Sequence, residues 1–228
     1  MTQFALALAA FLALHSIPAM PGVRRQLIAT FGFQSYLLGY SAVSIAGLAW
    51  VFHAAFALDY IELWPPAPWQ AWPAILLSPV SALLIAAGLI SGNPASISMR
   101  RVGGQPGAIV AITRHPVLWG FLLWSFSHML ANGDLRSLLL FGSLALFSAA
   151  GMWIVERRQR RTLGVDWIQI QSSSSILPFA AIARGRARLR FDREMGIALV
   201  LSVLITIWLL SGGHAALFGA DPLAMAAL

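Results

Sequence analysis

The stretch WGFLLWSFSHMLANGD, residues 119–134, is almost entirely apolar until it stops at the polar turn Asn-Gly-Asp. An apolar run of this length belongs either in a lipid bilayer or in a buried core. The run also contains His128, a polar side chain that is costly to place in either environment. The stretch therefore predicts a buried or membrane helix, and its histidine is a candidate functional residue.

The composition of the whole chain decides between these environments. Of its 228 residues, 59% are hydrophobic and only 10% are charged, whereas a soluble domain carries about 25% charged residues. We therefore expect an all-α, polytopic membrane helix bundle that forms a single transmembrane domain over residues 1–228. The chain contains no cysteine, which excludes a disulfide framework and a thiolate metal site.

Apolar segments of about 20 residues predict about six transmembrane helices. The first segment has no charged leading region and no clear small-residue cleavage site, so we expect a retained helix and not a signal peptide. The expected spans are residues 2–20, 36–58, 72–91, 116–132, 135–155 and 195–212.

The basic residues test this number of helices. All 15 are arginines, and fourteen of them, Arg101 included, fall on the side of the membrane that holds the first, third and fifth loops. Only Arg136 falls on the other side, where the second loop carries Asp59 and Glu62. Because positively charged loops stay in the cytoplasm, both chain termini are predicted to face away from it. The basic run at 184–194 is expected to contact anionic lipid headgroups, and nucleic-acid binding is disfavoured.

Five histidines are candidate polar sites. His15 and His128 each lie inside an apolar span, where a polar side chain is expected to face the bundle interior. Two imidazoles without cysteines or inward carboxylates do not make a tetrahedral zinc site, but they suit the two axial positions of a haem. The alternative is that each one hydrogen-bonds a neighbouring helix. Depth in the membrane alone would instead pair His15 with His115, or His53 with His128, and His214 is expected to be interfacial.

The segment ITRHP, residues 112–116, is the other dense group of polar side chains. Pro116 suits the first turn of a helix, and it disfavours helical geometry at His115 before it. Arg114 and His115 are therefore expected at the cytoplasmic mouth of the bundle. They form either a helix cap with a snorkelling arginine or a site for an anionic or polar group, and the spacing leaves both alternatives open.

Three segments carry a resemblance to the NnrU family of bacterial membrane proteins and its plant relatives, the 15-cis-zeta-carotene isomerases. The matching segments, in the same order along the chain, are LALHSIPAMPGVR at 12–24, ITRHPVLWGFLLWSFSHMLANGD at 112–134 and SILPFAAIARGRARL at 175–189. The resemblance implies one NnrU-like transmembrane domain, located in the bacterial inner membrane. It also implies a b-type haem whose iron is held by the residues that match His15 and His128, and Arg114 and His115 are further candidate cofactor-binding residues.

Two details qualify this resemblance. The plant isomerases look to have a cysteine three residues before the second ligand, where this chain has Ser125. Because the chain contains no cysteine, a thiolate ligand to the iron is excluded here. The ITRHP segment also resembles the Arg-His-Pro element of isoprenylcysteine-type membrane methyltransferases, which bind S-adenosylmethionine. The stretch GVDW at 164–167 and Pro178 fall where those enzymes continue their second motif.

These features support four functional hypotheses. The first is a haem-binding redox or sensing protein of NnrU type, linked to nitrite or nitric oxide metabolism. The second is a haem-dependent isomerase, in which the iron passes an electron to a polyene such as a 15-cis-carotenoid and thereby lowers the barrier to rotation. The third is methyl transfer at Arg114 and His115. The fourth is a non-catalytic assembly factor for a respiratory reductase. Across these hypotheses, the expected partner is either a hydrophobic small molecule or a respiratory reductase.

Overall fold

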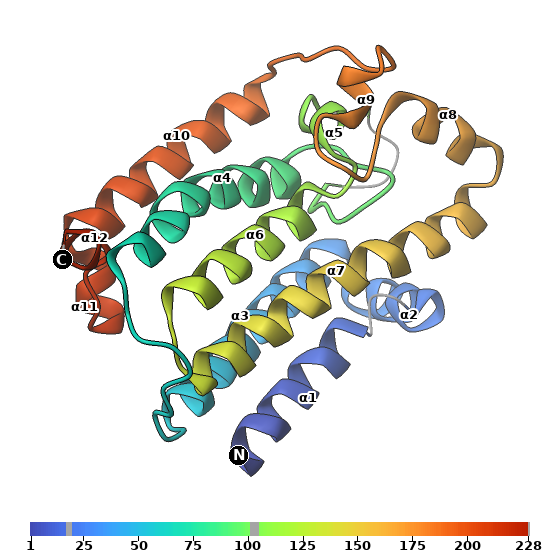
Figure 1. The fold of residues 1–228 in the computed structure, drawn as a ribbon. Helices are drawn as coiled ribbons and strands as arrows, with labels where there is room; N and C mark the ends of the chain where they lie inside the picture. The colour runs from blue at the N-terminus through green and yellow to red at the C-terminus, as the bar shows by residue number, and fades with distance from the viewer. Residues whose placement is uncertain (17–19, 101–104, 228) are drawn as a thin grey trace. The chain divides into compact units, whose positions relative to one another are not determined.

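In the described part of the computed structural model, all regular secondary structure is helical (Figure 1). The structure describes residues 1–16, 20–100 and 105–227, so Arg101 lies outside the described residues. Within this part of the chain, extended segments meet only in an isolated bridge between Glu62 and Asp134. The predicted fold class, an all-α membrane helix bundle, is confirmed.

Six apolar helices correspond to the six expected spans. Four of them are long and apolar enough to cross a membrane. The other two, α1 and α6, contain 15 and 16 residues, which at 1.5 Å per residue gives about 22 to 24 Å. The six helices are α1 (Thr2–Ser16), α3 (Phe33–Phe56), α4 (Ala71–Ile90), α6 (Pro116–Ala131), α7 (Leu135–Leu163) and α10 (Arg193–Trp208).

The helix that holds the fifth expected span, residues 135–155, extends beyond that span. Helix α7 continues through the basic stretch to Leu163 and ends at Gly164, whose φ is +52°. Glutamate, arginine and glutamine are good helix formers, so polarity ends the apolar surface without ending the helix. Short helices also occupy two of the segments that connect the spans, α2 (Pro21–Phe31) and α8 (Val165–Ser173).

The chain forms two compact units, each described by itself. The first unit comprises residues 1–63 and 134–140, and in it α1 and α2 both pack against α3. The second unit comprises residues 64–133 and 141–227 and holds most of the remaining helices. Whether residues 1–228 fold as a single transmembrane domain stays a prediction.

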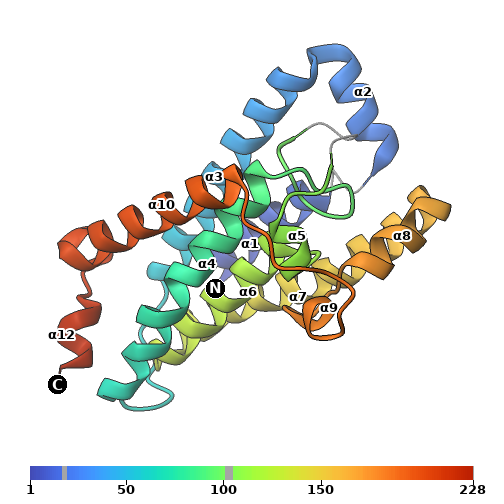
Figure 2. The same ribbon diagram turned by 90° about the horizontal axis from the view of Figure 1, so that it is seen from above.

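In the second unit, α4 lies between α6 and α10 (Figure 2). The backbones of α4 and α6 approach closely at Gly120, where a Cβ atom would lie 2.6 Å from Ile85 Cγ1 and 2.8 Å from the Ser81 carbonyl oxygen. Small residues at such a crossing allow close packing of membrane helices. On the other side of α4, the hydroxyl of Ser202 donates to the carbonyl of Pro79 at 2.6 Å.

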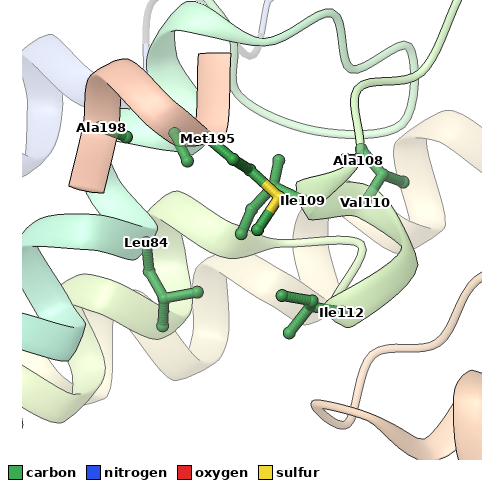
Figure 3. Close-up of a cluster of buried hydrophobic side chains, with 8 residues drawn as sticks. Leu84, Ala108, Ile109, Val110, Ile112, Met195 and Ala198 are labelled. Carbon is green, nitrogen blue, oxygen red and sulfur yellow. The ribbon is translucent and has the colours of Figure 1, made fainter. Parts of the chain in front are cut away.

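A cluster of buried apolar side chains holds the short helix α5 (Ile109–Ile112) against α4 and α10 (Figure 3). Leu84, Ile109 and Met195 each come from a different helix of this cluster. Because α5 is anchored here, the residues that follow it are held at the start of α6. The remaining short elements are η2 (Pro68–Gln70), α9 (Ala180–Ala183), η3 (Leu209–Gly213), α11 (His214–Phe218) and α12 (Pro222–Ala226).

Candidate functional site

The segment ITRHP forms the junction between α5 and α6, as its proline predicts. Pro116 is the first residue of α6, and His115 precedes the helix with φ −119° and ψ 60°. The proline ring disfavours helical backbone at this preceding residue. The turn buries both polar side chains, since Arg114 is 3% and His115 is 0% exposed.

Groups from two distant segments hold the guanidinium of Arg114. Its Nη1 lies 2.6 and 2.9 Å from the two carboxylate oxygens of Glu156. Its Nε donates to the hydroxyl of Ser174 at 3.0 Å, and its Nη2 donates to the Ser174 carbonyl at 3.1 Å. The ring of Trp167 also lies against this group, with its centroid 4.9 Å from Cζ. Each guanidinium nitrogen therefore already has an acceptor within the protein.

The imidazole of His115 bridges two further side chains. Its Nε2 lies 2.8 Å from Oε1 of Glu156, and its Nδ1 lies 2.8 Å from the hydroxyl oxygen of Ser96. Because a carboxylate only accepts hydrogen bonds, Nε2 carries a proton. In the neutral imidazole, Nδ1 then accepts the hydroxyl proton of Ser96. Glu156 is thus shared between a guanidinium and an imidazole.

We call this group the polar cluster; it consists of Ser96, Arg114, His115, Glu156 and Ser174. Two hydrogen bonds to the backbone of Arg114 strengthen the cluster. The side-chain amide of Asn93 donates to the Arg114 carbonyl at 3.0 Å, and the Arg114 N–H donates to the Ser175 carbonyl at 2.8 Å. The cluster ties the start of α6 to the segments that follow α4 and α8. A buried polar network in which the members satisfy one another favours one rigid arrangement.

Glu156 is the member of the polar cluster that the sequence reasoning missed. It is the first charged residue after the apolar part of α7 and the only carboxylate in that helix. A single acid that directly follows an apolar span is a signal that could have identified it as the partner of a buried arginine. The assignment of Arg114 and His115 as cofactor-binding residues stays a prediction.

His128 lies in the last turn of α6 with its imidazole among aromatic rings. Its ring centroid is 4.9 Å from that of Trp124 and 5.2 Å from that of Phe141 on α7. Its Nδ1 lies 2.8 Å from the Trp124 carbonyl oxygen. A carbonyl only accepts hydrogen bonds, so Nδ1 carries the proton and Nε2 of the neutral ring carries a lone pair.

His15 shows the same pattern in the first unit. Its Nδ1 lies 2.9 Å from the carbonyl oxygen of Phe11, one turn earlier in α1. Its ring packs against Phe11, with centroids 4.1 Å apart, and against Tyr40 of α3 at 5.9 Å. His15 and His128 belong to different units, so their pairing on one iron stays a prediction.

The other two histidines have different surroundings. His53 lies in the last turn of α3, in the first unit. The interfacial position expected for His214 stays a prediction. His214 is the first residue of α11, and its ring centroid is 6.5 Å from that of His128. The sequence offers no signal for this proximity, because the two residues are far apart in the chain. The contact depends on a kink before α11, where Ser211 and Gly212 have non-helical backbone angles.

The hydrogen bonding of His128 is that of a candidate metal ligand. Metal-ligating histidines usually donate their second ring N–H to a carbonyl or carboxylate, which is the arrangement at Nδ1. Among the described residues, no three His, Asp or Glu side chains come together to hold a metal ion. A macrocycle supplies its own equatorial ligands and requires only one or two from the protein. One turn before His128, the buried hydroxyl of Ser125 has no hydrogen-bond partner among the residues that the structure describes.

The comparison with known families identifies the chain. The family described as NnrU protein matches residues 3–222. The chain belongs to the NnrU family. The resemblance seen in its three segments is therefore confirmed over nearly the whole chain.

Two curated relatives are plant enzymes. This NnrU-family chain is 34% identical over 84 residues to the chloroplastic 15-cis-zeta-carotene isomerase of Arabidopsis thaliana. It is 35% identical over 86 residues to the chloroplastic 15-cis-zeta-carotene isomerase of Zea mays. Each match covers 37% of this chain and 23% of the relative. No solved structure matches the chain.

Proposed function

We propose that this NnrU-family protein is a membrane isomerase that holds a b-type haem at His128 and acts on a conjugated polyene such as 15-cis-zeta-carotene. The observation that carries the proposal is the imidazole of His128, whose Nδ1 is bonded to the Trp124 carbonyl and whose ring packs among aromatic side chains. The likeness to two isomerases that act on this carotene supports the choice of reaction.

The residues near His128 have separate parts in this proposal. A bound haem would supply an iron that exchanges an electron with the polyene and so lowers the barrier to rotation about a double bond. The carbonyl of Trp124 keeps the proton of the imidazole on Nδ1, which leaves Nε2 as the ligand atom. The rings of Trp124 and Phe141 provide an apolar environment that matches both a macrocycle and a polyene.

The test is product analysis on the purified, haem-loaded protein. Protein in detergent, reduced with dithionite, is mixed with 15-cis-zeta-carotene in the dark, and the isomers are separated by chromatography. We expect conversion of the 15-cis bond to trans, and we expect the His128→Ala variant to leave the substrate unchanged. Haem-loaded protein that produces no isomer in excess over free haemin would contradict the isomerase assignment.

A second candidate function is redox or sensing chemistry with nitrite or nitric oxide. The match to the NnrU family over residues 3–222 favours it, because this match is much longer than the match to the isomerases. The same haem at His128 would serve it, and the chain would then act beside a respiratory reductase in the bacterial inner membrane. A shift of the haem absorption on addition of nitric oxide, without polyene turnover, would favour this candidate.

Methyl transfer has less support from the geometry. The guanidinium of Arg114 and the imidazole of His115, which would have to bind the cofactor, already engage Glu156. A cofactor carboxylate would therefore have to displace a partner that is bonded to both of them.

A further inference from the structure

A hollow lies along the last turns of α7, before the chain continues into α8 (Figure 1). Its volume is about 430 Å³, and ligand sites have volumes of about 300–1,000 Å³. We call it the basic hollow; the residues that line it are Trp153, Ile154, Arg157, Arg158, Arg161 and Thr162. Its combination of apolar and basic side chains is the reason to ask what it binds.

Helical spacing places these side chains on one face of α7. Trp153, Arg157 and Arg161 follow one another at intervals of four residues, and Ile154 and Arg158 form the row beside them. Residues three or four apart are neighbours on a helix surface. The polarity of the basic hollow therefore changes along the helix, from two apolar side chains at one end to three arginines at the other.

The apolar end lies where the hydrophobic part of α7 stops. The side chains of Trp153 and Ile154 are 62% and 51% exposed, and the apolar span predicted from the sequence ends at residue 155. Exposed tryptophans are enriched where hydrocarbon meets headgroups. The Cζ atom of Arg157 lies 4.4 Å from the centroid of the Trp153 ring, and cation–π attraction holds the guanidinium at this level. The hollow thus spans the boundary between hydrocarbon and headgroups.

The basic end carries a positive charge that the helix itself does not balance. Among the described residues that line the hollow, none is acidic. Glu156, the only carboxylate of α7, is bound by Arg114 and His115 in the polar cluster. The C-terminal end of a helix contributes about half a negative charge, which three guanidinium groups outweigh. Because guanidinium groups bind phosphate through paired hydrogen bonds, a phosphate is the anion that fits this end.

We propose that the basic hollow is a binding site for an anionic phospholipid. The phosphate of the lipid lies among the three arginines, and the first part of an acyl chain lies against Trp153 and Ile154. A lipid matches both ends of the hollow, whereas a free phosphate would use only the arginines. The arginine distribution predicts that this end of α7 is cytoplasmic, and the cytoplasmic leaflet is rich in anionic lipids. This inference is independent of the haem and of the reaction proposed above.

The test is native mass spectrometry of the full-length protein in detergent, titrated with phosphatidylglycerol or with phosphatidylcholine of the same acyl chains. We expect phosphatidylglycerol to remain bound at concentrations at which phosphatidylcholine does not. The triple variant Arg157→Gln, Arg158→Gln, Arg161→Gln should bind phosphatidylglycerol roughly 100-fold more weakly, since each arginine contributes about 1 kcal/mol. Trp153→Ala should also weaken the binding, and Trp153→Phe should restore it.

The matched control removes the same charge elsewhere. Arg184, Arg188 and Arg190 are exposed residues of the segment before α10, and their replacement by glutamine should leave the affinity for phosphatidylglycerol within about fivefold of the wild type. Equal losses in the two triple variants would overturn the proposal, because the attraction would then belong to the net charge. Equal binding of the two lipids would also overturn it.

Two other occupants give distinct results in the same spectra. Displacement of phosphatidylglycerol by an equal concentration of inorganic phosphate would make the hollow a site for a free anion and overturn the lipid. A dimer that dissociates in the first triple variant, with no lipid bound to either form, would assign the hollow to a second copy of the chain. If the triple variant does not fold, as judged by circular dichroism, the single change Arg161→Gln at an exposed position should weaken binding about fivefold.

Discussion

The two ends of α6 carry polar groups of opposite kinds. At its start, the polar cluster satisfies a buried arginine and a buried histidine with protein partners, Glu156 above all. At its end, within the described part of the chain, the imidazole of His128 is hydrogen-bonded through Nδ1 alone. ITRHP and the later histidine were both candidate sites in the sequence, and the structure separates them by what their polar atoms already bind. A satisfied buried network stabilises the fold, whereas an imidazole with a lone pair available can bind a metal.

The largest expected effect concerns the side of the membrane on which each end of α6 lies. Because fourteen of the fifteen arginines share one side, we propose that the polar cluster faces the cytoplasm and both termini face the periplasm. Reporter domains fused after Asp59 and after Asp134 should be periplasmic, and a reporter fused after Gln171 should be cytoplasmic. A cytoplasmic reporter after Asp59 would contradict the orientation and the six-helix topology.

Removing Glu156 should weaken the fold more than any other single change to the polar cluster. In Glu156→Ala, Arg114, whose side chain is 4% exposed, loses its counter-charge, and breaking a buried ion pair in this way costs about 3–5 kcal/mol. The measurement is the free energy of unfolding by denaturant in detergent micelles.

The matched control for this change is Glu194→Ala, which breaks the ion pair with Arg100. Here the arginine side chain is 58% exposed, and exposed pairs contribute at most about 1 kcal/mol. Equal losses of stability in the two variants would show that the polar cluster has no special structural role.

The His115→Ala variant should lose fold stability without losing haem. His115→Ala leaves the hydroxyl of Ser96 and one contact of Glu156 without their partner, and unsatisfied buried groups cost about 1–3 kcal/mol. Haem per folded molecule should stay close to that of the wild type, as measured by the pyridine haemochrome assay. Loss of haem from folded His115→Ala would make His115 a ligand instead.

The smallest effect is expected from Ser125, and Ser174 is its matched comparison. Ser125→Ala removes a hydroxyl that has no hydrogen-bond partner, so the free energy of unfolding should change by less than about 1 kcal/mol. Ser174→Ala removes the hydroxyl that accepts from Arg114 Nε and should cost about 1–3 kcal/mol. Equal changes in the two variants would contradict the distinction between satisfied and unsatisfied groups.

Much of the fold could be predicted because the membrane limits the chain to a few simple patterns. Apolar length located all six helices, and Pro116 located the start of α6 and the turn at His115. The end of α7 could not be placed from hydropathy, since the helix continues to Leu163 as a polar helix.

The sites were harder to predict, because they depend on contacts between distant segments. The segment ITRHP drew attention to Arg114 and His115, but their partner Glu156 lies on another helix. The contact between His128 and His214 depends on the kink at Gly212. A sequence pattern shows which residues are unusual in a membrane, whereas the fold decides which of them meet.

The central claim is that His128 holds haem iron, and the absorption spectrum of the purified protein tests it most directly. Wild-type protein expressed with ample haem should copurify with about one haem per chain and show a sharp, low-spin reduced spectrum. His128→Ala should lose the haem or become high-spin, and His115→Ala, at the other end of the same helix, should keep it. A folded wild-type protein that purifies colourless, or a folded His128→Ala with an unchanged spectrum, would contradict the claim.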